Sequence, residues 1–186
     1  MSIAAAFAAD KDASFHVGPA AGYPHRQTSA KVTIAADPYV TPEKAKMAFG
    51  KVDPYRLGVL PVLVVMQNDS DKVIRLDQIK AEYVGPNRDR VDATPAGEVR
   101  YLNGPRRPDV VVGPTGPKVG RSKKNPLNEW EIEGRAFAAK MLPPGQSASG
   151  FFYFQTGLQH GATLYLTGLS EARTGQELFY FEIPLE

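Results

Sequence analysis

The last third of the chain alternates short aromatic runs with glycine turns, and this feature limits the fold more than any other. The runs cover residues 151–154, 163–166 and 178–183. Runs of this length, rich in aromatic and β-branched residues, are typical of strands in a sandwich or barrel. The chain also holds 16 Pro and 17 Gly among its 186 residues, which counts against a helical bundle. We therefore predict a mainly all-β fold.

Three earlier segments also have the patterns of strands. Residues 31–35 alternate polar with apolar side chains, and residues 59–67 leave neither face polar, as in a fully buried strand. Residues 73–84 resume as a strand, and we expect a break near Asp77. The second half of this last segment alternates regularly, so one of its faces is predicted to be buried.

The first aromatic run presents a choice between burial and exposure. Alternation sends Phe152 and Phe154 to one face of the strand and Phe151 and Tyr153 to the other. One face could be a partner-facing or sugar-stacking patch. We favour burial of both faces, one by the opposite sheet and one by a helix.

Two helical segments are predicted within the β-rich chain. Thr41 is an N-cap residue, Pro42 suits the first helical position, and Gly50 supplies a stop, so residues 42–49 are predicted to form a short helix. A second helix is predicted over residues 126–141, although 130–133 also alternate like a strand. The residues at helical spacing in this second segment are Trp130, Gly134, Phe137 and Met141.

The predicted organisation is an N-terminal arm over residues 1–30, followed by a single β-sandwich domain over 31–186 with a loop insertion at 100–125. The arm lacks a hydrophobic period. Its residues 6–8 have the Ala-x-Ala form of a signal-peptidase site, without a basic region before them. We therefore expect the tail of a secretory signal here, against the alternative of a plain Ala-rich arm.

The segment from Arg100 to Lys124 is the main candidate for partner binding. It holds seven Lys or Arg residues against one Asp, with frequent Gly and Pro. A solvated flap is the simplest interpretation, and contact with an acidic protein surface or lipid headgroups is the functional one. Nucleic acid is not expected, because Tyr101 is the only aromatic residue available for stacking. The candidate partner-binding residues are Arg106, Arg107, Lys118, Arg121, Lys123 and Lys124.

No residue pattern predicts catalysis, a metal site or a cofactor. The chain has no cysteine, and its three histidines, His16, His25 and His160, have no ligand-spaced partners. Residues 68–71 carry closely spaced oxygen atoms, but they lack the glycine and the distant Glu of a calcium loop. We expect these side chains to cap a tight turn instead.

Two segments carry a resemblance to a known class of proteins. Residues 61–72 form an apolar strand ending in an Asn-Asp-Ser-Asp turn, and residues 142–154 combine Pro-Pro-Gly, small polar residues, Gly and an aromatic strand. Together they resemble immunoglobulin-like β-sandwich modules of secreted bacterial proteins and lipoproteins. The resemblance implies an immunoglobulin-like sandwich, a secreted or periplasmic location at the cell envelope, and no enzymatic activity; it supplies no catalytic residue.

These observations predict a non-enzymatic, secreted or envelope-associated binding or structural module that acts through surface contacts. The expected partner is a protein of the cell envelope or another copy of the chain. The alternative is a carbohydrate-binding or accessory domain of an extracellular hydrolase. No apolar run approaches the roughly 20 residues that a membrane-spanning helix needs, so no transmembrane segment is predicted.

Overall fold

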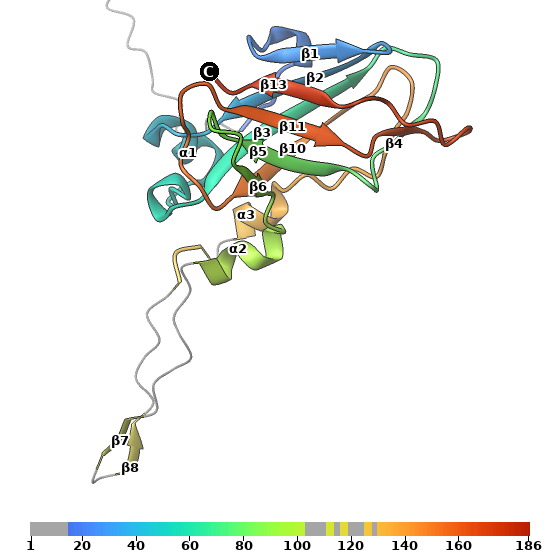
Figure 1. Cartoon of the computed structure of the whole chain (residues 1–186). Helices are drawn as coiled ribbons and strands as arrows, with labels where there is room; N and C mark the ends of the chain where they lie inside the picture. The colour runs from blue at the N-terminus through green and yellow to red at the C-terminus, as the bar shows by residue number, and fades with distance from the viewer. Residues whose placement is uncertain (1–14, 103–110, 114–115, 119–124, 128–129) are drawn as a thin grey trace, which may run out of the picture.

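The protein is built from two antiparallel four-stranded sheets, with strand orders β1-β2-β3-β10 and β13-β11-β5-β6 (Figure 1). The computed structural model describes residues 15–102, 111–113, 116–118, 125–127 and 130–186. The mainly β fold class is thereby confirmed. The strands of the first sheet are β1 (Arg26–Ser29), β2 (Val32–Pro38), β3 (Leu60–Asn68) and β10 (Ser147–Phe154). Those of the second are β5 (Lys80–Val84), β6 (Arg90–Asp92), β11 (Thr163–Thr167) and β13 (Phe181–Pro184).

Shorter elements complete the described part of the chain. A small third sheet joins β4, β9 and β12, and β7 pairs with β8 in a hairpin that Figure 1 draws away from the two main sheets. The short strands are β4 (Ile74–Arg75), β7 (Val111–Gly113), β8 (Gly116–Lys118), β9 (Met141–Leu142) and β12 (Ser170–Glu171). The helices are α1 (Pro42–Phe49), α2 (Ala96–Leu102) and α3 (Trp130–Gly134), with 3-10 turns η1 (Ala20–Gly22) and η2 (Tyr55–Leu57).

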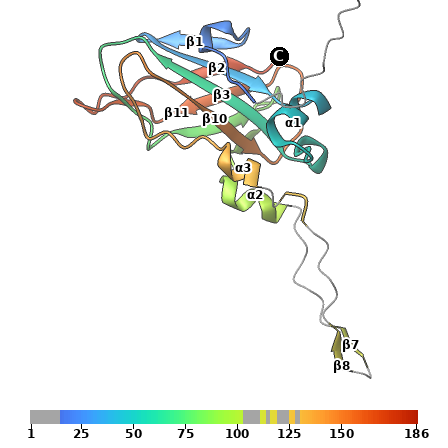
Figure 2. The same cartoon turned by 180° about the vertical axis from the view of Figure 1, so that it is seen from behind.

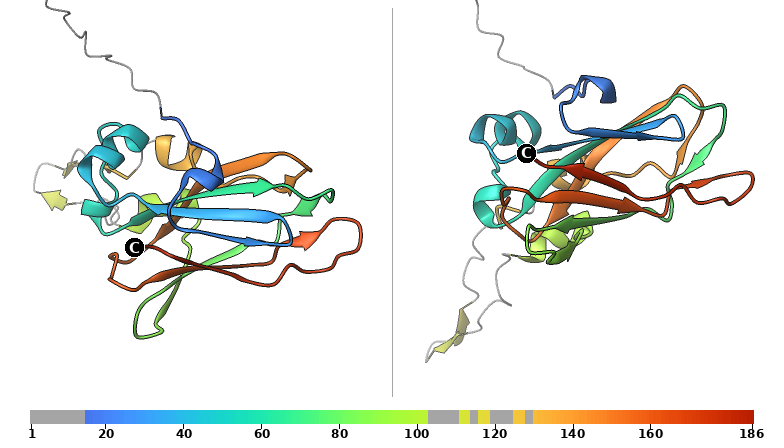
Figure 3. Two further views of the ribbon diagram at one scale, coloured as in Figure 1. Left: turned by 90° about the horizontal axis from the view of Figure 1, so that it is seen from above. Right: turned by 45° about the horizontal axis from the view of Figure 1, so that its top comes forward.

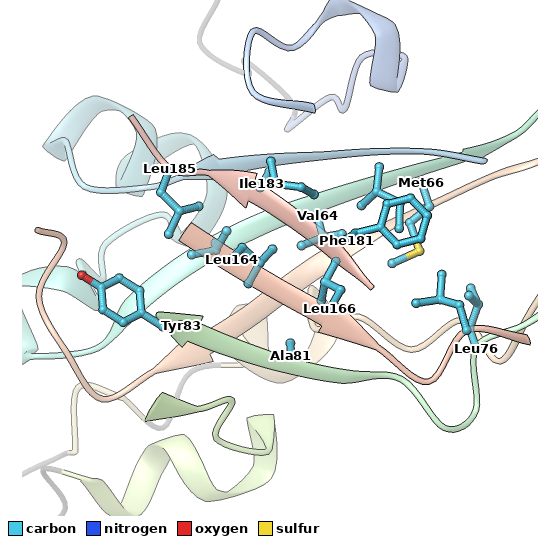
Figure 4. Close-up of a cluster of buried hydrophobic side chains, with 14 of the residues drawn as sticks. Val64, Met66, Leu76, Ala81, Tyr83, Leu164, Leu166, Phe181, Ile183 and Leu185 are labelled. Atoms are coloured by element: carbon cyan, nitrogen blue, oxygen red, sulfur yellow. The ribbon is translucent and has the colours of Figure 1, made fainter. Parts of the chain in front are cut away.

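The two sheets pack face to face over the larger hydrophobic core (Figure 4). Strand alternation directs Val64 and Met66 of β3 toward Leu164 and Leu166 of β11, and all four side chains are buried. The phenol of Tyr83 lies at one end of this core, where its hydroxyl accepts a hydrogen bond from the backbone of Gln159 at 3.0 Å. The predicted burial of one face in the second half of residues 73–84 is confirmed, because Ala81 and Tyr83 are both buried.

A second core covers the opposite face of the first sheet, and the helices build it. Phe151 and Tyr153 of β10 point away from the second sheet and pack against Phe49 of α1, Val99 of α2 and Ile132 of α3. Figures 2 and 3 show α1 and α3 on this side. Both faces of the aromatic run are thus covered, as predicted, and β3 is apolar on both faces because it lies between two cores.

The predicted helix at 42–49 and the predicted break in residues 73–84 are both confirmed. Thr41 Oγ1 accepts a hydrogen bond from the Lys44 backbone at 3.3 Å, and Gly50 ends α1 with a φ of 65°. β4 and β5 are separated by a turn at residues 77–78. Local capping chemistry and short-range alternation were sufficient to find these elements.

The predicted helix over 126–141 is wrong for most of its length. α3 is a single turn and Met141 belongs to β9. After Gly134 the chain becomes extended beside β10: Phe151 N donates to Arg135 O at 2.9 Å, and Phe137 N donates to Phe151 O at 3.0 Å. A Cβ on Gly150 would lie 2.5 Å from the Phe137 Cα, so glycine permits this approach. Hydrogen bonds to the backbone groups at the edge of β10 therefore determine the extended conformation of these residues, although their side-chain spacing fits a helix.

The region before residue 31 contains a strand that the sequence did not predict. β1 pairs with β2 in antiparallel register, and the side chain of Gln27 accepts a hydrogen bond from Glu182 N of β13 at 2.7 Å. β1 thereby connects the two sheets along one side. Residues 6–8, the signal-like motif, lie outside the described residues.

Opposite this side, two consecutive residues connect the sheets. Ala93 N donates to Ala81 O of β5 at 2.9 Å, and Thr94 N donates to Tyr153 O of β10 at 2.7 Å. The chain therefore leaves the edge of the second sheet and joins the edge of the first within one residue. α2 begins directly after this crossing.

The turn after β3 is organised by Asn68, whose side chain is fully buried. Its amide nitrogen donates to Lys72 O at 2.7 Å and to Leu142 O at 2.9 Å, and its oxygen accepts from the Ser70 backbone and hydroxyl at 3.1 and 2.6 Å. The expected role of this segment as a capped turn is confirmed. The amide also joins the turn to β9, 74 residues away in sequence.

We predict that Asn68→Ala lowers the free energy of unfolding by about 2 to 4 kcal/mol, because the buried Leu142 carbonyl loses its side-chain donor and the turn loses its bonds to Lys72 and Ser70. Asp69→Ala is the matched control, since Asp69 is exposed and its change is expected to stay within about 0.5 kcal/mol. Chemical denaturation of the three proteins measures the difference. Equal losses for the two variants would contradict the assigned role of Asn68.

The turn between β1 and β2 offers a stabilising substitution. Ala30 and Lys31 both have positive φ angles, 49° and 61°, as a two-residue hairpin turn of type I′ requires. Asn and Gly adopt this conformation more readily, so Ala30→Asn combined with Lys31→Gly is expected to raise stability by about 1 kcal/mol. Ala30→Val should lower it, because a β-branched side chain is strained there. Thermal unfolding compares the variants, and a stabilising Ala30→Val would refute this account.

Candidate functional site

The helices α2 and α3 form one end of the protein and hold two exposed aromatic side chains. The two helices contact each other below the first sheet (Figures 1 and 2). Val99 and Ile132 take the buried positions on them, so Tyr101 and Trp130 point outward, with 73% and 71% of their surfaces exposed. Two exposed aromatic side chains at the two ends of a strongly basic segment mark a candidate interaction site.

α3 is held rigidly against the sheet beneath it. The Tyr153 hydroxyl donates to the backbone oxygen of Ile132 at 2.6 Å. Burial raises the pKa of this phenol well above its ordinary value, so the hydroxyl keeps its proton and remains a donor. The backbone that carries Trp130 is therefore fixed by a buried hydrogen bond, and an anchor residue on such a backbone loses little freedom on binding.

Arg100 connects the exposed residues of the two helices. Its guanidinium lies 5.5 Å from the ring centre of Tyr101 and 2.8 Å from a carboxylate oxygen of Glu133. The Asn125 side chain donates to the backbone oxygen of Arg100. This last contact brings together the two ends of the basic segment, which we define as residues 103–124.

The basic residues that were predicted to bind a partner lie in the sequence between α2 and α3. Lys118 lies in β8, opposite Val111 of β7. The other members of the set, Arg106, Arg107, Arg121, Lys123 and Lys124, lie outside the described residues. The basic segment therefore starts at the end of α2 and ends shortly before α3. The sequence analysis did not predict α2 or the β7–β8 hairpin.

Sequence reasoning placed Trp130 incorrectly. Its spacing from Phe137 and Met141 predicted a common helical face, but Trp130 and Met141 are exposed and Phe137 lies in the extended segment beside β10. Leu127 and Ile132 are the residues of this region that enter the helix-covered core. The pattern that could have located the buried face of this region is the pair of aliphatic residues Leu127 and Ile132, which lie on either side of Trp130 in the sequence.

A groove of about 550 Å³ opens between β5 and β10, next to the start of α2. The rings of Phe137 and Phe152 stack in its lining at a centroid separation of 5.2 Å. Lys80, Glu82 and Asp92 provide its charged groups. The volume lies in the range of small-ligand sites, and the stacked rings suit an apolar group.

The histidines and carboxylates of the described residues do not form a metal site. No group of three or more His, Asp or Glu residues among them is arranged to hold a metal ion. His160 is exposed and its Nδ1 lies 2.6 Å from a carboxylate oxygen of Glu186. His16 is exposed and His25 is half-buried, so the three histidines do not converge on a common site.

Comparison with known proteins adds no family assignment. No protein-family model matches the chain, and a search of curated proteins finds no match. Among the residues that the structure describes, no helix has the length and apolar character needed to cross a membrane. The candidate site therefore rests on the geometry of α2 and α3 and on the sequence of the segment between them.

Proposed function

We propose that this protein is a non-enzymatic, secreted or envelope-associated binding module with an immunoglobulin-like sandwich, and that it binds a protein partner through its α2–α3 end and basic segment. The observation that carries the proposal is the exposure of Tyr101 and Trp130 at the two ends of a segment rich in Lys and Arg. The fold supports it, because two packed antiparallel sheets form a rigid support for such a surface.

The residue types at this end are those that dominate binding energies in protein interfaces. Trp, Tyr and Arg are enriched among residues whose truncation weakens binding most. Here Trp130 and Tyr101 supply large apolar surfaces at small entropic cost, and Arg100 is already oriented by Tyr101 and Glu133. In such an interface the aromatic side chains at the centre provide most of the binding energy, and the charged side chains around them select the partner.

The charges of the segment indicate what the partner presents. Six Lys or Arg and one Asp give residues 103–124 a charge of +5, whereas the whole chain carries +2, so the rest of the chain carries −3. The positive charge of the protein is thus concentrated in one segment. A partner with an acidic surface is attracted by it, and this attraction weakens as salt screens it.

Affinity purification of the tagged full-length protein from its native cells, followed by mass spectrometry, tests the proposal. We expect a stoichiometric protein partner that elutes as salt is raised. The double variant Tyr101→Ser, Trp130→Ser should weaken its binding at least about tenfold. Met47→Ser, which changes an exposed side chain on α1, is the control and should leave recovery unchanged.

Two results would overturn the proposal. Recovery that is equal for the double variant and the control would exclude the α2–α3 end as the binding surface. A polysaccharide recovered with the protein, without a protein partner, would favour the carbohydrate-binding alternative.

A further inference from the structure

The outward face of the second sheet carries a row of carboxylates around a central tyrosine. Tyr165 of β11 lies opposite Glu82 of β5 on one side and Glu182 of β13 on the other, and Glu82 lies opposite Asp92 of β6. Like charges directly opposite each other in a sheet are destabilising. Glu82 and Asp92 form such a like-charge pair, which Arg90 offsets through its ion pair with Glu82.

One tyrosine–glutamate pair on this face already binds a cation. The Arg90 guanidinium lies 4.9 Å from the ring centre of Tyr165, and its Nη1 lies 2.7 Å from a carboxylate oxygen of Glu82. An aromatic face and an adjacent carboxylate together suit a guanidinium, because the ring quadrupole and the negative charge both attract it.

A second pair of the same chemistry lies beside the first. The Tyr180 ring stacks on Tyr165, with centroids 5.2 Å apart and planes 28° apart, and 51% of its surface is exposed. Glu182 follows two residues later in extended chain and faces the same side. Among the described residues, no Lys, Arg or His pairs with Glu182 or stacks on Tyr180.

We propose that Tyr180 and Glu182 receive an Arg or Lys side chain from the basic segment of a second copy of this chain. The inference rests on the proposed function, since it names one partner of the same basic segment. Charge complementarity supports this inference. The basic segment has a charge of +5. The outward face of the second sheet has three carboxylates and two cations, which are Glu82, Asp92, Glu182, Arg90 and Lys80. Arg90 shows within one chain the geometry that the second copy would reproduce.

The contact joins two different surfaces of the molecule. The acceptor pair lies on the outward face of the second sheet, whereas the basic segment leaves from α2. Such a contact forms either reciprocally between two copies or head to tail along a chain of copies. In both cases association increases with protein concentration and decreases with salt.

Sedimentation of the full-length protein at 10 to 200 μM, on the order of the affinity of a small charged contact, measures the association. We expect the average mass to rise with concentration at low salt and to return to the monomer value at high salt. Tyr180→Ala and Glu182→Lys should each weaken association about tenfold. Phe179→Ala is the matched control, because Phe179 is the adjacent residue, is 84% exposed, and should leave association unchanged.

A mixing experiment makes the assignment specific. A face variant, Glu182→Lys, and a segment variant, Arg106→Glu with Arg107→Glu, should each self-associate at least about tenfold more weakly than the unchanged protein. Mixed, they should form a one-to-one complex, because one chain keeps a normal segment and the other a normal face. A protein that stays monomeric under all conditions, or association that survives Tyr180→Ala, would overturn the inference. A different result tests the proposed function: it is wrong if the double variant Tyr101→Ser, Trp130→Ser still binds the partner of the unchanged protein.

Discussion

The structure depends on the burial of the first sheet from both sides. β3 presents an apolar surface to each side, so the sheet is stable only when the second sheet covers one face and the helices cover the other. The aromatic residues of β10 meet the same requirement, because Phe154 enters one core and Phe151 the other. The helices α1, α2 and α3 are short, and their role is to close this second core. The second sheet needs no such cover on its outward face, which is why charged and aromatic residues are exposed there.

Most of the strands and the helix α1 could be predicted from sequence because local patterns determine them. Thr41, Pro42 and Gly50 define α1 by their own backbone chemistry, and the alternation in β5 follows from one buried face. α3 could not be predicted in this way. The extended course of residues 135–137 is set by backbone hydrogen bonds to Phe151, a residue distant in sequence, and no spacing within the segment reports that contact. β1 was missed for a similar reason, since its pairing with β2 depends on a turn of Ala30 and Lys31, neither of which is a usual residue for positive φ.

The candidate site was partly visible in the sequence. The density of Lys and Arg between Arg100 and Lys124 stands out from composition alone. The exposed aromatic residues beside it do not, because Trp130 is exposed only as a result of Ile132 taking the buried position on α3. The pairing of Tyr180 with Tyr165 also lies beyond sequence reasoning, since it depends on the register between β11 and β13. Composition therefore identified the charge of the candidate surface, and tertiary structure identified the exposed aromatic residues beside it.

The contact between Asn125 and Arg100 has a consequence for how this protein can change over evolution. Because the basic segment leaves and returns at neighbouring points, its length and composition can vary without stretching any strand or opening either core. The entropy of closing such a loop rises only slowly with its length, so even large insertions would disturb folding little. The segment can therefore be exchanged or lengthened while the two sheets and the three helices that support it keep their packing.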